Sequence, residues 1–119
     1  MYHALIIKQS LINLNPIEGL KILTTKEDGG WTIYKVAISE EKLDKFIKKI
    51  QDNMDNTKEW YMHIFNEDGS RLIVIYRDKI FDTDNNPQNW SEVIKYGESL
   101  GIPSEQLDFV PNSFSTEEY

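Results

Sequence analysis

The sequence contains no cysteine among its 119 residues. This absence excludes disulfide frameworks, thiolate zinc sites and cysteine nucleophiles. The sequence also has no apolar stretch near the roughly 20 residues that a membrane-spanning helix needs. Its first residues, MYHALIIKQSL, have neither the basic region nor the apolar length of a signal peptide. We therefore expect a soluble, cytoplasmic protein that does not bind membranes.

Short motifs that carry known chemistry are also missing. The sequence has no GxGxxG, GxxxxGK[ST] or GxSxG motif, so nucleotide-binding loops and serine-hydrolase elbows have no support. His3 and His63 are too far apart for an HxH or HxxxH pair, which disfavours a metal shared with Asp78 or Glu59. The segment 82–87, DTDNNP, begins like a calcium loop but lacks the required glycine. We predict no cofactor and no metal.

Basic side chains are scarce in the last third of the chain. Residues 81–119 contain eight acidic residues and one basic residue, Lys95, and they account for the whole net charge of −7. Such a charge opposes binding to a phosphate backbone. Lys42, Lys45 and Lys49 form one row on a predicted helix, but nearby acidic residues indicate an ordinary solvated face. We therefore predict no nucleic-acid partner.

The length and the 14 aromatic residues favour one globular domain over residues 1–111. Residues 112–119 are polar and are predicted to form a mobile C-terminal tail. Runs of β-forming residues predict strands, and EDG sequences before two of them predict tight hairpins. The predicted strands are 2–7, 20–25, 31–38, 59–66 and 71–77, with a last short strand or an extended tail at 105–110.

Two helices are predicted between and after these strands. Residues 40–54 place apolar side chains at i, i+3, i+4, i+7 and i+11, which is one stripe of an amphipathic helix. Residues 87–100 form the second, because Asn86 can cap it, Pro87 suits its first position and Gly101 suits its end.

The element order predicts an α+β fold, with a largely antiparallel sheet of about five strands and both helices on one face. Residues 31–110 also fit the βαββαβ order of ferredoxin-like folds. That order would place 105–110 beside 31–38, where the hairpin partner 20–25 also belongs. We favour the hairpin, which leaves 59–66 at an edge. The predicted strand order is 2–7, 20–25, 31–38, 71–77, 59–66.

The hairpin around Asp68 and Gly69 is apolar on both faces. A two-residue turn there pairs Phe65 with Leu72, His63 with Val74, and Tyr61 with Tyr76. One face is then aliphatic and suits helix packing. The other face is aromatic, consists of Tyr61, His63, Phe65 and Tyr76, and needs a cover. The cover is a second copy, a bound small molecule or the chain's own segment 107–114.

Two functions from different classes follow from this face. The leading hypothesis is a non-enzymatic domain that forms a homodimer, or that binds a protein partner or an apolar small molecule through Tyr61, His63, Phe65 and Tyr76. The alternative is a small enzyme in which His63 is a general acid or base, with Tyr61 or Tyr76 as its hydrogen-bond partner. We favour a structural His63, because the sequence identifies no second oriented group.

Overall fold

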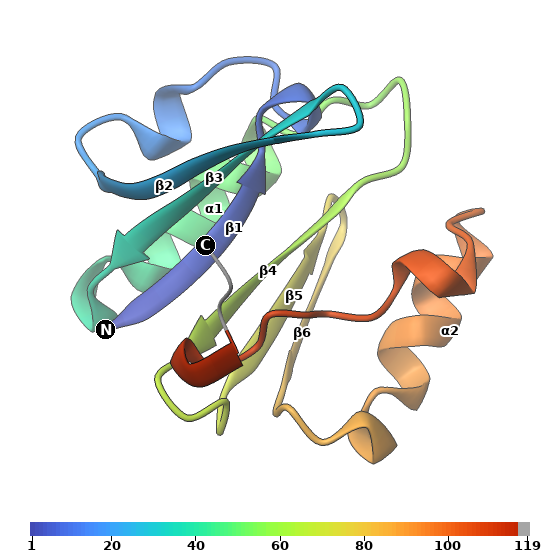
Figure 1. The fold of residues 1–119 in the computed structure, drawn as a ribbon. Helices are drawn as coiled ribbons and strands as arrows, with labels where there is room; N and C mark the ends of the chain where they lie inside the picture. Colours follow the sequence, from blue (N-terminus) through green and yellow to red (C-terminus); the bar gives the residue numbers. More distant parts are fainter. Residues whose placement is uncertain (117–119) are drawn as a thin grey trace.

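The chain folds around one six-stranded antiparallel sheet with the strand order β2-β3-β1-β4-β5-β6 (Figure 1). The structure is a computed structural model that describes residues 1–116. None of the described helices is long and apolar enough to cross a bilayer. The strands are β1 Tyr2–Ile7, β2 Lys21–Asp28, β3 Trp31–Ile38, β4 Tyr61–Asn66, β5 Leu72–Tyr76 and β6 Lys79–Thr83.

Both predicted hairpins form. β2 and β3 meet at Gly29 and Gly30, whose φ angles of 58° and 89° suit a residue without a Cβ. In the second hairpin, β4 pairs with β5 in the predicted register, with His63 opposite Val74. The turn residues therefore fixed which side chains share a face.

The predicted strand order is wrong, because β1 lies between β3 and β4. β1 pairs antiparallel with both neighbours, so that Leu5 lies between Lys35 and His63. A strand buried on both faces, as YHALII largely is, fits the middle of a sheet. Consequently β4 is an interior strand and not an edge.

The outer strand β6 was not predicted. Its sequence KIFDT is short and half polar, with a burial pattern typical of an edge. By contrast, of the two alternatives predicted for 105–110, a strand or an extended tail, the strand does not form. These residues start with a 3-10 turn followed by irregular chain. The ferredoxin-like order needs that strand and is not confirmed.

Helix α1 (Leu43–Asp52), preceded by a 3-10 turn at Glu40–Lys42, covers one face of the sheet. The predicted apolar stripe packs there against side chains such as Ile6 and Ile75. Each fully buried aliphatic or phenylalanine side chain contributes about 1.5–3 kcal/mol of transfer free energy. Four of the five predicted stripe residues lie in α1, namely Leu43, Phe46, Ile47 and Ile50. The fifth, Met54, lies just beyond the end of the helix and is buried in the same core.

Helix α2 (Ser91–Ser99), preceded by a 3-10 turn at Pro87–Asn89, covers the opposite face. The prediction that both helices share one face is therefore wrong. β5 explains why: every one of its residues is buried, with Ile73 and Ile75 toward α1 and Val74 and Tyr76 toward α2. A strand that is apolar on both faces needs cover on both sides.

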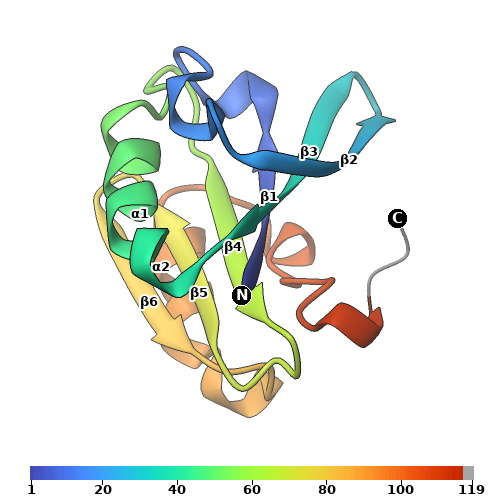
Figure 2. The same cartoon turned by 90° about the vertical axis from the view of Figure 1, so that its left-hand side faces the viewer.

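The irregular segment after α2 completes this second layer. Leu107 and Phe109 are buried against β4 and β5, and Figure 2 shows this segment and α1 on opposite sides of β4. Part of the predicted tail 112–119 lies outside the described residues. Of its described part, Ser113 is buried and Phe114 stacks on His3 with ring centroids 3.8 Å apart. The mobility of the tail stays a prediction.

Candidate functional site

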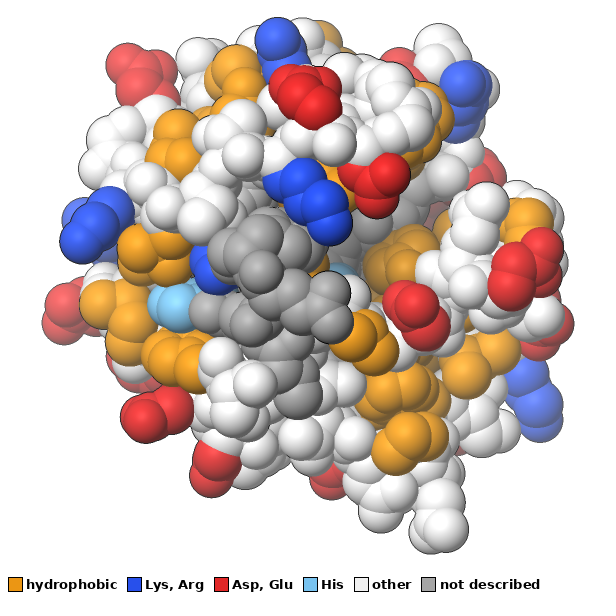
Figure 3. Space-filling view, in the orientation of Figure 1, with side chains coloured by type: hydrophobic (Ala, Val, Ile, Leu, Met, Phe, Trp, Pro, Cys, Tyr) orange, Lys and Arg blue, Asp and Glu red, His pale blue; other side chains and the backbone are white. Residues whose placement is uncertain are grey.

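The second layer covers the sheet unevenly and leaves a cavity of about 600 Å³. α2 and the C-terminal segment cover β4 and β5, whereas side chains on the same face of β3 and β1 line the cavity. Figure 3 shows a hollow here, with hydrophobic side chains beside it and charged side chains of both signs at its edge.

The floor of the cavity is apolar. Ile7 and Ile33 lie opposite each other on β1 and β3, and Leu5 lies opposite His63 of β4. Tyr61, two residues before His63 on β4, completes this surface. The period-two alternation of three adjacent strands places these side chains on one face.

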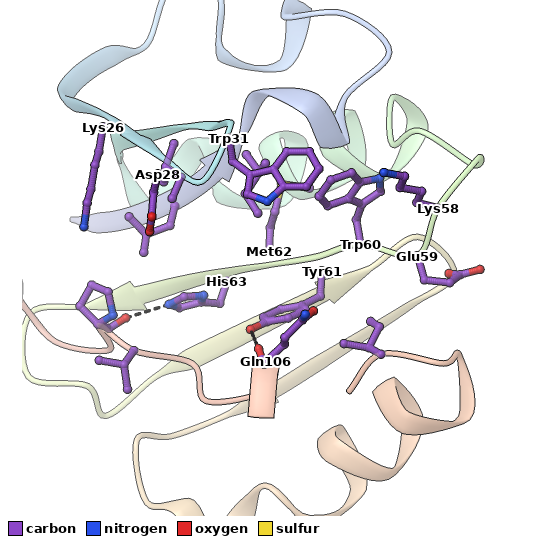
Figure 4. Close-up of a pocket in the computed structure, with 16 residues that line it drawn as sticks. Lys26, Asp28, Trp31, Lys58, Glu59, Trp60, Tyr61, Met62, His63 and Gln106 are labelled. Carbon is purple, nitrogen blue, oxygen red and sulfur yellow. Dashed lines mark hydrogen bonds between the residues drawn. The ribbon is translucent and has the colours of Figure 1, made fainter. Parts of the chain in front are cut away.

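One wall comes from the C-terminal segment, which two side chains of β4 hold in place. The hydroxyl of Tyr61 donates a hydrogen bond to the carbonyl of Gln106. Nε2 of His63 lies 2.8 Å from the carbonyl oxygen of Pro111. Figure 4 shows both bonds running from the cavity floor to this segment. Val110, between them, remains 58% exposed and is available to a ligand.

His63 is a neutral donor in this arrangement. Burial lowers its pKa, and the hydrogen bond to Pro111 and the charge of Asp108 oppose this effect only partly. Because a carbonyl oxygen only accepts, the Nε2 atom carries the proton and Nδ1 keeps a lone pair. The ring is 6% exposed. His63 therefore positions the wall of the cavity.

Tyr61 is likewise a hydrogen-bond donor and not a base. Burial raises the pKa of its hydroxyl, and the nearby Asp108 and Tyr76 raise it further. The phenol therefore stays protonated at neutral pH. Its ring also packs edge-on against Phe109, with centroids 5.4 Å apart.

Two tryptophans form the rim of the cavity. The indoles of Trp31 and Trp60 lie nearly perpendicular, at 88°, with centroids 5.0 Å apart. Trp60 is fixed further by a hydrogen bond from its Nε1 to Asp55, at 3.3 Å. The Nζ atom of Lys58 lies 5.5 Å from the centroid of a Trp31 ring. In Figure 4 the two indoles lie side by side above Tyr61.

Charged side chains lie at both ends of this rim. Asp28 pairs with Trp31 across the β2–β3 hairpin, and its carboxylate points into the cavity (Figure 4). Glu59 lies at the other end and forms an ion pair with Arg77, at 3.6 Å.

The structure places the four predicted binding residues on one face, but only two of them line the cavity. Phe65 and Tyr76 are fully buried beneath the second layer, while Tyr61 and His63 reach the open space. Of the three covers that the sequence left open, the chain's own C-terminal segment is the one observed. The role of these residues in binding stays a prediction.

Sequence reasoning missed the tryptophan rim. Trp31 follows the Gly-Gly turn, and alternation along 31–38 does place it on one face with Ile33. Which face that is depends on the strand order, and the order was predicted wrongly. Trp60 precedes β4, packs partly against the core on the α1 side and also touches Trp31 at the end of the sheet.

The residues weighed for a metal site are spread over the molecule. His3 stacks on Phe114, whereas Glu59 and Asp78 both face Arg77. Within residues 1–116, no three His, Asp or Glu side chains gather in a way that could hold a metal ion.

No family model, no curated protein and no solved structure matches this chain. The chemistry of the site therefore carries the functional argument alone. An apolar floor, an aromatic rim and hydrogen-bonded, uncharged Tyr61 and His63 are suited to holding a ligand.

Proposed function

We propose that this protein is a non-enzymatic binding protein that takes a small molecule with an apolar body into the cavity beside β1 and β3. The observation that carries the proposal is the cavity itself, which has an apolar floor and is walled by the chain's own C-terminal segment. Its volume of about 600 Å³ lies within the range of roughly 300–1,000 Å³ that is typical of small-molecule sites.

The distribution of polar groups also supports binding over catalysis. His63 and Tyr61 each direct a proton to a backbone carbonyl, so the two most interesting titratable groups are already engaged. His63 has a lowered pKa and Tyr61 a raised one, which leaves both uncharged. A general acid or base needs a partner that orients it toward the substrate, so the enzyme alternative has weaker support.

Self-association is a separate part of the proposal, and the reason for it that was inferred from the sequence no longer holds. That argument took β4 for an exposed edge, and β4 lies inside the sheet. The outer strands remain candidates for a homodimer, because Ile22 on β2 and Ile80 on β6 are 46% and 42% exposed. Sedimentation of the purified protein tests whether it forms a homodimer.

A cytoplasmic location is proposed on the absence of cysteine.

A cavity-filling variant tests the binding proposal. Ile33 lines the cavity, whereas Ile22 lies opposite Val36 and belongs to the other face. We expect the neutral fluorescent probe N-phenyl-1-naphthylamine to bind the wild-type protein with saturation at one site. Ile33→Trp should weaken this binding at least tenfold, because the indole fills the space, and Ile22→Trp should leave it unchanged.

Two results would count against the proposal. One is a wild-type protein that shows no saturable binding of the probe. The other is equal probe binding by Ile33→Trp and by wild type, with both variants folded by circular dichroism.

A further inference from the structure

The aromatic rim of the cavity already holds a cation. The ammonium of Lys58 lies 5.5 Å from the centroid of a Trp31 ring, within the range of a cation–π contact. Lys58 is exposed and forms no ion pair with any carboxylate of the described residues. Besides Trp31, Lys58 has an electrostatic attraction to Asp55. An exposed side chain with only these contacts can be displaced by a better cation.

The indoles form a corner. Trp31 and Trp60 touch edge to face at 88°, so a group in the angle formed by the two ring planes meets both aromatic side chains at once. The hydrogen bond from Trp60 to Asp55 fixes one of the two planes. Trp31 is 37% exposed, so it remains accessible from solvent. Two electron-rich rings at a right angle favour a large, weakly hydrated cation.

A carboxylate lies beside this corner. Asp28 is the cross-strand neighbour of Trp31, and Figure 4 shows its carboxylate directed into the cavity. Asp28 forms no ion pair within the described residues, whereas Glu59, at the far end of the rim, is paired with Arg77. The lining as a whole is balanced, with Lys26 and Lys58 against Asp28 and Glu59, so Asp28 supplies the local attraction for a cation at this corner.

We propose that the ligand carries an alkylated ammonium group, which binds in the corner formed by Trp31 and Trp60, beside Asp28, while its apolar body lies on the cavity floor. This inference rests on the proposed function, because the same cavity holds the body of the ligand. Alkyl groups on the nitrogen weaken its hydration, so transfer into the corner costs less than for a bare ammonium. The ligand cation replaces Lys58 on the Trp31 ring.

A charged probe and its uncharged isostere separate the inference from the proposed function. Benzyltrimethylammonium and neopentylbenzene have nearly the same shape and differ by one positive charge. We expect the cation to bind about fivefold to thirtyfold tighter, the gain of a partly desolvated cation–π contact. The indole N–H signals of Trp31 and Trp60 should shift in nuclear magnetic resonance spectra. That of Trp90, which donates to the carbonyl of Asp84 at 2.7 Å, should not.

A variant of Lys58 tests whether the corner of Trp31 and Trp60 prefers a cationic or an anionic ligand. Lys58→Met removes the resident cation and keeps an unbranched side chain that is one atom shorter, so it should tighten binding of benzyltrimethylammonium severalfold. An anionic ligand that pairs with Lys58 would instead bind more weakly to this variant. Asp28→Asn should weaken the cation by about threefold or more. Asp44→Asn, an equal change of charge on α1 at the other face, should not.

Each outcome has one meaning. Equal affinity for the cation and its isostere overturns the inference and leaves the proposed function standing, whereas no binding of either overturns both. Weaker cation binding by Lys58→Met overturns the inference. A second binding experiment uses a peptide that contains trimethyllysine. If it binds at least as tightly as benzyltrimethylammonium, the cation belongs to a protein side chain, and if only the small molecule binds, it belongs to a free ligand.

Discussion

Phe109 is expected to be one of the main anchors of the C-terminal segment, and its removal should destabilise the whole domain. The side chain is completely buried. Its ring makes edge-on contacts with Trp90 and Tyr61, with centroids 5.1 and 5.4 Å away, and with His63 at 6.4 Å. It therefore connects α2, β4 and the segment that walls the cavity.

The cost of Phe109→Ala follows from this burial. Truncation of a fully buried phenylalanine lowers the free energy of unfolding by about 3–5 kcal/mol. Unfolding entropy is about 2.1 cal/mol/K per residue, so a loss of about 4 kcal/mol in a chain of 119 residues corresponds to roughly 16 °C in Tm. A polar tail lying loosely on the surface would give a change near zero.

Urea and thermal unfolding, followed by far-ultraviolet circular dichroism, measure this change. Val110→Ala is the matched control, because the neighbouring side chain is largely exposed, and it should cost less than about 0.5 kcal/mol. A loss below about 1 kcal/mol for Phe109→Ala, or equal losses for the two variants, would refute the view that this segment is part of the core.

Two further predictions concern α2 and the buried histidine. Gly97→Ala should lower stability by about 1–3 kcal/mol, despite the better helix propensity of alanine, because a Cβ there lies 2.7 Å from the Tyr76 hydroxyl and 2.9 Å from Leu107. Glu98→Ala, on the exposed side of the same helix, is the control in urea unfolding, and equal effects would contradict the close packing. For His63, the folded-state pKa is lowered, so below the unfolded value of about 6.5 the unfolded chain binds more protons. The free energy of unfolding should therefore decrease as the pH is lowered through this window, by up to about 1.4 kcal/mol per pH unit. His63→Gln should flatten the profile between pH 7 and 5.5, and parallel profiles would show that His63 is not the cause.

Local features of the fold were predictable from the sequence. The stripe of α1 from Leu43 to Ile50 follows helical spacing, and the register of His63 opposite Val74 follows from the Asp-Gly turn. Each depends on residues close together in the chain. Local patterns therefore predicted these two features correctly.

Non-local features were not predictable. The position of β1 depends on pairing with β4, which is nearly 60 residues away, and no turn residue encodes that contact. The side that α2 covers depends on it too, because only the finished sheet shows which face remains open. The rim was missed for the same reason: Trp31 and Trp60 meet only once β3 and β4 flank β1.

The position of β1 also divides the molecule mechanically. In the described sheet, the hairpin β2–β3 and the meander β4–β5–β6 share no ladder, and β1 joins them like a seam. The cavity spans this seam, since its floor takes Ile33 from one half and His63 from the other. A molecule lodged there would clamp the two halves together. Amide protons along Tyr2–Ile7 should then exchange more slowly in the loaded protein than in the empty one.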